Sequence, residues 1–181
     1  MGLDMYLTRK LYLGASYEHN KITGKIEIYK DGKLLDIDLS KIDEIEQRAG
    51  YWRKANAIHN WFVANVQDGM DDCDEYYVSK ADLQSLLDTV NDVLSKIKMK
   101  KGRLHSGTRW EGGVKTELYE QGKVIKNPEV CEALPTTSGF FFGGTDYNEW
   151  YVDSLKETKA ILEESLDPKY DNFSFYYHSS W

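Results

Sequence analysis

The alternation of apolar and polar residues predicts several short strands. It begins near the start of the chain and predicts a first strand over Leu3–Leu13. It recurs on both sides of Asp31-Gly32, a strong two-residue turn signal, and predicts a hairpin over Lys25–Leu39. Three Phe residues in a row between glycines are typical of a strand buried on both faces. The further short strands are expected at Glu75–Val78, Gly139–Gly143 and Phe173–Tyr177.

Apolar residues recur every three to four positions in three longer segments, which is the spacing of an amphipathic helix. Ser79 and Asp82 closely match a capping box at the start of the second segment. Thr145 or Asp146 is expected to cap the third segment. A shorter helix is expected over Ser40–Arg48. The three longer segments are Tyr51–Gln67, Ser79–Ile97 and Tyr147–Leu166.

Residues 98–113 are basic, contain glycine and show no periodicity, so we expect a basic loop there. Gln121-Gly122 then predicts a second hairpin over Val114–Lys126. Taken together, the patterns predict an α+β fold in which antiparallel strands and two hairpins pack against three main helices. The length of 181 residues is that of a single domain, which we expect to span residues 1–181.

Charge and composition make several classes of protein unexpected, among them nucleic-acid binders, membrane-spanning proteins and disulfide-rich proteins. The net charge of −7 makes nucleic acid an unexpected partner, because phosphate contacts need a basic surface. Within that total, residues 96–126 carry nine basic residues against three acidic ones, which would steer an anionic ligand. No apolar run is long enough to span a membrane, and the first residues lack a signal core, so we expect a cytoplasmic protein. Two cysteines are too few for a disulfide framework.

The first group of candidate residues lies in the predicted helix over Tyr51–Gln67. A helical wheel places Asn56 and His59 on the same inward side as Trp52. Two interpretations remain open, because buried polar groups need partners. Asn56 and His59 either bond the protein's own atoms, or they line a pocket in which Trp52 stacks on a planar ligand. In the second case Arg53, at the edge of this side, would hold a phosphate or carboxylate.

The second group lies where the strand predicted over Gly139–Gly143 runs through Gly143-Gly144 into a helix. Such a junction offers free N–H groups and a positive helix end, which suit an anion, and glycines let a ligand approach the backbone. A tight turn between strand and helix explains the same residues without a ligand. The candidate ligand-binding residues of both groups are Trp52, Arg53, Asn56, His59, Ser138, Gly139, Gly143, Gly144 and Tyr147.

The sequence contains no complete catalytic or metal-binding motif. The acidic segment Asp71–Glu75 lacks the ligand spacing of a calcium loop, so we interpret it as a solvated loop. Acidic neighbours of Cys73 would raise its thiol pKa rather than activate it. We therefore expect no catalytic residue, no metal and no cofactor.

Five stretches of the chain carry a resemblance. They are MGLDMYL at the start, WRKANAIHNWFV and VQDG with DDC in the middle, LPTTSGFFFGGTDY, and SSW at the end. On these stretches the chain resembles a family of small proteins encoded by bacteriophages and prophages. The resemblance implies a phage context, expression in the cytosol of a bacterial host and an accessory role.

Three functions follow as hypotheses. The leading one is a non-catalytic phage protein that binds a small anionic or nucleotide-like ligand and sequesters a host immune signal, a counter-defence role reached by analogy. The second is an inhibitor that contacts a host protein through exposed aromatic residues such as Trp61, Trp110 and Trp181. The third is a nucleotide hydrolase with His59 or His178 as base. The sequence is also compatible with a homo-oligomer.

Overall fold

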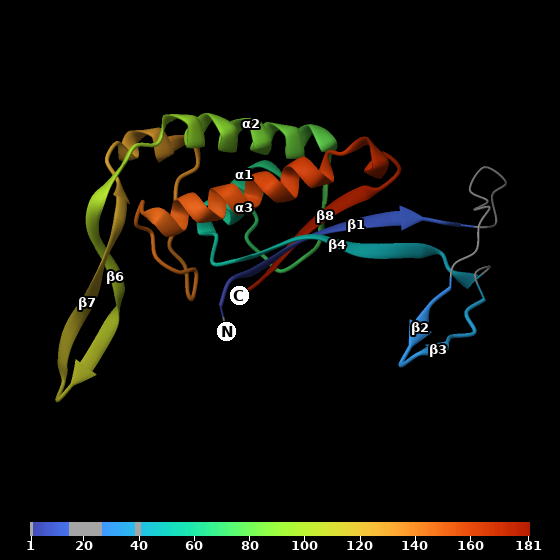
Figure 1. Ribbon diagram of the computed structural model, residues 1–181, viewed down its shortest axis with the longest axis horizontal. Coiled ribbons are helices and arrows are strands. Elements are labelled where there is room, and N and C mark those ends of the chain that lie inside the picture. The colour runs from blue at the N-terminus through green and yellow to red at the C-terminus, as the bar shows by residue number, and fades with distance from the viewer. Residues whose placement is uncertain (1, 15–26, 39–40) are drawn as a thin grey trace.

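A computed structural model describes residues 2–14, 27–38 and 41–181 of the chain (Figure 1). Its centre is a four-stranded antiparallel sheet in the order β4-β1-β8-β5. The first and last strands of the chain pair directly, with Asp4 opposite Ser180, so the two termini lie side by side. The strands are β1 (Asp4–Tyr12), β4 (Glu44–Arg53), β5 (Tyr76–Val78) and β8 (Ser174–Ser180).

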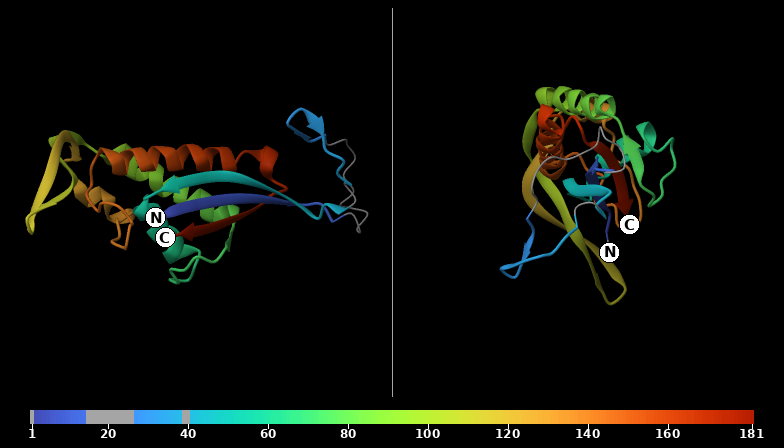
Figure 2. Two further views of the ribbon diagram at one scale, coloured as in Figure 1. Left: turned by 90° about the horizontal axis from the view of Figure 1, so that it is seen from below. Right: turned by 90° about the vertical axis from the view of Figure 1, so that its right-hand side faces the viewer.

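The two longest helices, α2 (Lys80–Lys96) and α3 (Glu149–Ser165), lie together on one side of this sheet (Figures 1 and 2). The capping box at the start of α2 is confirmed: Ser79 Oγ accepts from Asp82 N, and the Asp82 carboxylate accepts from Ser79 N. A shorter helix, α1 (Asn56–Asn65), follows β4. No helix in the described ranges is long and apolar enough to cross a membrane.

Large aromatic side chains join α1 and α3 to the sheet. Trp52 of β4 is fully buried, and its indole Nε1 donates to Thr158 Oγ1 of α3 at 2.9 Å. Phe62 of α1 stacks on Tyr177 of β8, with ring centroids 4.0 Å apart, and also contacts Trp52. The two helices therefore pack against the same face of the sheet, where fully buried side chains such as Met5 complete the core.

Two hairpins extend from opposite ends of the molecule (Figure 1). The small one pairs β2 (Tyr29–Lys30) with β3 (Lys33–Leu34). The large one, here called the arm, pairs β6 (Met99–Glu111) with β7 (Val114–Ile125). The base of the arm is tied to the body where Ile125 N donates to Tyr147 O at 3.0 Å. Two 3₁₀ helices cover Pro128–Ala133 and Pro168–Tyr170.

The predicted α+β class, with antiparallel sheets and three main helices, is confirmed. The first strand, the strand at Glu75–Val78, the second helix and the last strand lie where the sequence places them. The Asp31-Gly32 turn of the first hairpin is also present. The described residues do not include 25, 26 and 39, which lie at the two ends of the predicted hairpin. They also do not include 40, the first residue of the predicted short helix.

The short helix predicted over Ser40–Arg48 is wrong, because Glu44–Arg53 forms strand β4 along the whole length of β1. The longer helix predicted from Tyr51 begins only at Asn56 for the same reason. Glu, Gln and Ala favour a helix, but pairing with a neighbouring strand overrides that preference. Trp52 consequently lies on a strand, in the core, and not on a helix face.

The predicted basic loop over residues 98–113 is also wrong, because these residues contain strand β6. The turn of the second hairpin lies at Gly112-Gly113, both with positive φ, and not at Gln121-Gly122. Residues 101–123 are exposed or partly exposed except for Leu104. The arm therefore has no buried face, and so its sequence lacks the alternation of apolar and polar residues that predicts a strand.

The strand predicted over Gly139–Gly143 is absent, since these residues form a loop. Phe142 is buried, whereas Phe140 is 80% exposed and Phe141 adopts a positive φ of 67°. Helix α3 begins later than predicted: Asn148 caps it by accepting from the N–H groups of Trp150 and Tyr151, so neither Thr145 nor Asp146 is the cap.

Candidate functional site

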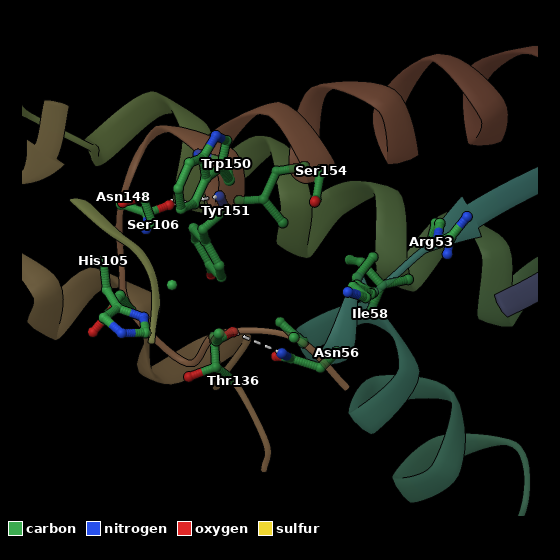
Figure 3. Close-up of a pocket in the computed structure, with 18 residues that line it drawn as sticks. Arg53, Asn56, Ile58, His105, Ser106, Thr136, Asn148, Trp150, Tyr151 and Ser154 are labelled. Atoms are coloured by element: carbon green, nitrogen blue, oxygen red, sulfur yellow. Dashed lines mark hydrogen bonds between the residues drawn. The ribbon is translucent and has the colours of Figure 1, made fainter. Parts of the chain in front are cut away.

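A cavity of about 470 Å³ opens where three segments of the body meet the arm; we call it the first cavity (Figure 3). The end of β4 and the start of α1 form one wall, with Arg53 and Asn56. The first turns of α3, with Trp150 and Ser154, form the opposite wall. His105 of the arm closes one side. The cavity size is in the usual range for a small-molecule site.

Two cations lie next to each other on the first wall. Arg53 ends β4, and Lys54 turns the chain toward α1 with a positive φ of 58°. Gly143, also on this wall, packs so closely that a Cβ there would lie 3.1 Å from the Lys54 Cβ, and its φ of 91° favours glycine. Both cations are exposed, and in the described part of the chain neither has a carboxylate within ion-pair distance.

The N-terminus of α1 opens into the same part of the first cavity. Its N-cap, Ala55, has no side chain that accepts a hydrogen bond. Within the described ranges, the N–H groups of Asn56 and Ala57 have no acceptor, and both residues line the cavity. Unpaired N–H groups at the positive end of a helix attract an anion. This helix end and the two neighbouring cations therefore favour the same kind of ligand group.

The opposite wall offers an aromatic ring. Trp150, in the first turn of α3, is 48% exposed, and in the described residues its indole N–H has no partner. The backbone N–H groups of this turn are already used by the Asn148 cap. Asp146, an exposed acid, also lines the cavity, so one negative charge accompanies the two positive ones. A ring with free polar neighbours suits stacking on a planar group.

Asn56 is buried, and its carboxamide bonds the protein's own atoms. Nδ2 donates to Phe142 O at 3.1 Å and to Gly144 O at 2.9 Å, and Oδ1 accepts from Thr137 N at 3.3 Å. The side chain therefore fixes the loop of residues 137–144 against the start of α1. Of the two sequence interpretations, bonding within the protein describes the Asn56 side chain, although the residue still forms part of the cavity wall.

His59 is also buried, and both of its ring nitrogens are engaged. Nδ1 lies 2.8 Å from Tyr177 Oη, and Nε2 lies 3.0 Å from Asp71 Oδ1. Asp71 Oδ1 also accepts from Trp181 Nε1 at 3.2 Å, so this network ties the acidic loop to the end of the chain. Burial lowers the pKa of His59 below its ordinary value, although Asp71 opposes the shift. His59 does not line the first cavity.

The first cavity thus brings together some of the sequence-predicted residues and not others. Those that line it are Arg53, Asn56, Gly143 and Gly144. Those that do not are Trp52, His59, Ser138, Gly139 and Tyr147.

Among the residues of the first cavity that sequence reasoning missed are Lys54, Trp150 and His105. Lys54 directly follows Arg53, and this pair of cations was the available signal. Trp150 falls within the helix predicted over Tyr147–Leu166 and was given no role there; it lies in the first turn of α3, where the helix opens to the cavity. No signal pointed to His105, because its segment was expected to be a loop.

The acidic segment Asp71–Glu75 binds other parts of the protein. Asp72 accepts from the Tyr76 hydroxyl at 2.9 Å, and Asp71 accepts from His59 and Trp181. In the described residues, no group of three or more His, Cys, Asp and Glu side chains is arranged to hold a metal ion.

Comparisons with protein-family models, with curated proteins and with solved structures gave no match. The resemblance to bacteriophage and prophage proteins therefore stays a prediction.

Proposed function

We propose that the protein binds a small anionic, nucleotide-like ligand in the first cavity and does not convert it. The observation that supports this most directly is the pair Arg53 and Lys54. Both cations are exposed on the cavity wall, without a carboxylate partner among the described residues, next to the uncapped N-terminus of α1. Three sources of positive potential at one place favour a phosphate or carboxylate.

The rest of the cavity fits the other parts of such a ligand. The exposed ring of Trp150 offers a stacking face for a planar base, across the cavity from the cations. The Asp146 carboxylate offers an acceptor for an amino group of that base. In this arrangement the anionic end of the ligand lies against α1 and its ring against α3.

Binding without turnover is proposed because the candidate bases lie elsewhere. His59 uses both ring nitrogens within the protein, and neither it nor His178 lines the first cavity. His105 does line it, with Nε2 bonded to Glu117, but among the described residues no hydroxyl or thiol that could act as a nucleophile is hydrogen-bonded to its ring. On the resemblance to phage proteins, the biological role would be sequestration of a nucleotide signal of host immunity in the bacterial cytoplasm.

A second candidate function, inhibition of a host protein by direct contact, is favoured by two exposed rings. Phe140 is 80% exposed and Trp110, near the tip of the arm, is 66% exposed. Large exposed apolar groups are often contact sites. Purification of the protein from lysate of a bacterial host separates the two functions: a stoichiometric protein partner whose capture requires Trp110 or Phe140 supports inhibition.

Isothermal titration calorimetry with AMP, ADP-ribose and cyclic di-AMP tests the leading proposal. Binding of at least one of them is expected, and Arg53→Ala and Trp150→Ala should each weaken it by about tenfold, since a charged contact or a stacked ring contributes roughly 1.4 kcal/mol or more. Matched controls are Arg48→Ala, on the same strand, and Trp110→Ala, on the arm; neither residue lines the cavity. No heat with any ligand, or equal losses in the controls, contradicts the proposal.

A further inference from the structure

A second cavity, of about 570 Å³, adjoins the first. The two share the same three lining residues, His105 of the arm and Asp146 and Asn148 of the body. The second cavity extends from these residues along one face of the arm, past Arg103 and Tyr119. The two cavities are therefore neighbours, and these three residues lie where they meet.

The second cavity repeats the chemistry of the first. The Arg103 guanidinium lies 4.6 Å from the centre of the Tyr119 ring, and Tyr119 is 49% exposed. Across the described chain, no carboxylate lies within ion-pair distance of Arg103. Each cavity thus holds an unpaired guanidinium and an exposed aromatic ring: Arg53 with Trp150 in the first, and Arg103 with Tyr119 in the second.

The second cavity is held in a defined position. His105 and Tyr119 are cross-strand partners whose rings meet edge to face, and Ile125 N donates to Tyr147 O at the base of the arm. Glu117 also lines this cavity, and three donors use its carboxylate. Bonds from Lys115, Thr108 and His105 hold its pKa at about 2, so it is ionised and its charge is offset by Lys115.

Resting on the proposed function, we infer that the natural ligand is a dinucleotide that places one base and one phosphate in each cavity. The base in the first cavity stacks on Trp150, with its phosphate toward Arg53. The base in the second stacks on Tyr119, with its phosphate toward Arg103. Stacking on aromatic rings with phosphates on neighbouring cations is the usual way proteins hold short single strands. Asp146 lies between the two halves as an acceptor for a base amino group.

Calorimetric titration of the full chain with AMP and with the linear dinucleotide pApA tests this inference. AMP carries one base and one phosphate and can fill one cavity, whereas pApA carries two bases and two phosphates and can fill both. The dinucleotide is expected to bind at least about tenfold more tightly, as the second stacked base alone contributes about that factor. In Tyr119→Ala, pApA should bind about as tightly as AMP binds in the first cavity, and AMP should keep its affinity for that cavity, which Tyr119 does not line. Leu118→Ala, a neighbouring residue on the opposite face of β7, is the control and should change neither affinity.

The outcomes separate the two proposals. If AMP and pApA bind equally well and Tyr119→Ala changes neither, the dinucleotide inference is overturned and the proposed function stands. If Tyr119→Ala weakens AMP and pApA by the same factor, the two cavities form one mononucleotide site, and the inference is again overturned. If neither probe nor cyclic di-AMP binds to the wild-type protein, the proposed function and the inference are both overturned.

Discussion

Within the described chain, the side chain of Gln67 is buried without hydrogen-bond partners, which destabilises the fold. It is fully buried just after α1, and in the described part of the chain neither its Nε2 nor its Oε1 has a hydrogen-bond partner. An unpaired buried amide costs roughly 1–3 kcal/mol. We expect Gln67→Met, which keeps the length of the side chain, to raise the free energy of unfolding by about 1 kcal/mol in denaturant titration. Gln121→Met, on the exposed arm, is the control, and a loss of stability in Gln67→Met contradicts the prediction.

His59 makes stability depend on pH. Asp71 Oδ1 accepts from Trp181 Nε1 and faces His59 Nε2, which places the His59 proton on Nε2, so that Nδ1 accepts from the Tyr177 hydroxyl. Burial lowers the pKa of His59 below 6.5, so the unfolded chain takes up a proton before the folded one does. The stability that neutral, buried His59 contributes is therefore fully present above pH about 6.5. It is lost as the pH falls below that value.

Unfolding by denaturant at pH 7.5 and pH 5.5 measures this effect. The wild-type protein should lose stability on acidification, and His59→Gln should lose less, because it has no group to protonate. His105→Gln is a matched control, since His105 is partly exposed. Equal losses in the wild type and His59→Gln would show that other groups cause the pH dependence.

The sequence predicted residues of the first cavity only where several of them lie close together in the chain. Arg53 and Asn56 were found because a helical wheel placed them near Trp52, although Arg53 ends strand β4 and Asn56 begins α1. Trp52 was misassigned, because a buried strand and a buried helix face are equally apolar over a few residues. Trp150 and His105 join the site through tertiary contacts between distant segments, which local patterns do not encode.

At the scale of elements, α2 was predicted accurately because every local signal agrees. Its apolar stripe, its capping box and the lysine in its last turn all indicate the same helix. Strand β6 is the opposite case, because its stability depends on pairing with β7 and not on a buried face. Strand β4 was missed because its partner, β1, lies more than thirty residues away in sequence.

The cap of α2 gives a prediction at this scale. Ser79→Ala removes the hydroxyl that accepts from Asp82 N, and should lower the free energy of unfolding by about 1 kcal/mol. Ser85→Ala, on the exposed side of the same helix, should cost nothing, because Ala is the better helix former there. Thermal or denaturant unfolding of both variants measures the difference. A Ser79→Ala variant as stable as Ser85→Ala contradicts the role of the cap.

At the scale of the whole molecule, stability and binding lie in different parts of the chain. Strand β8, the last in sequence, pairs with both β1 and β5 and contributes the buried Phe175 and Tyr177, so the sheet is complete only when the C-terminus is in place. The arm contributes one buried side chain from residues 101–123, Leu104, but it forms much of the second cavity. The arm is therefore expected to serve binding more than folding.

Replacement of residues 101–123 by Asn-Gly tests this division. Lys100 and Val124 are opposite each other in the ladder, so a two-residue turn joins them without changing their pairing. The loss of Leu104 burial costs about 2 kcal/mol, which lowers the melting temperature by about 4–8 °C while unfolding remains a single cooperative transition. A matched truncation that removes Ser174–Trp181 should instead abolish the transition, because it leaves β1 and β5 without their shared partner. An armless protein that fails to fold would show that the arm belongs to the core.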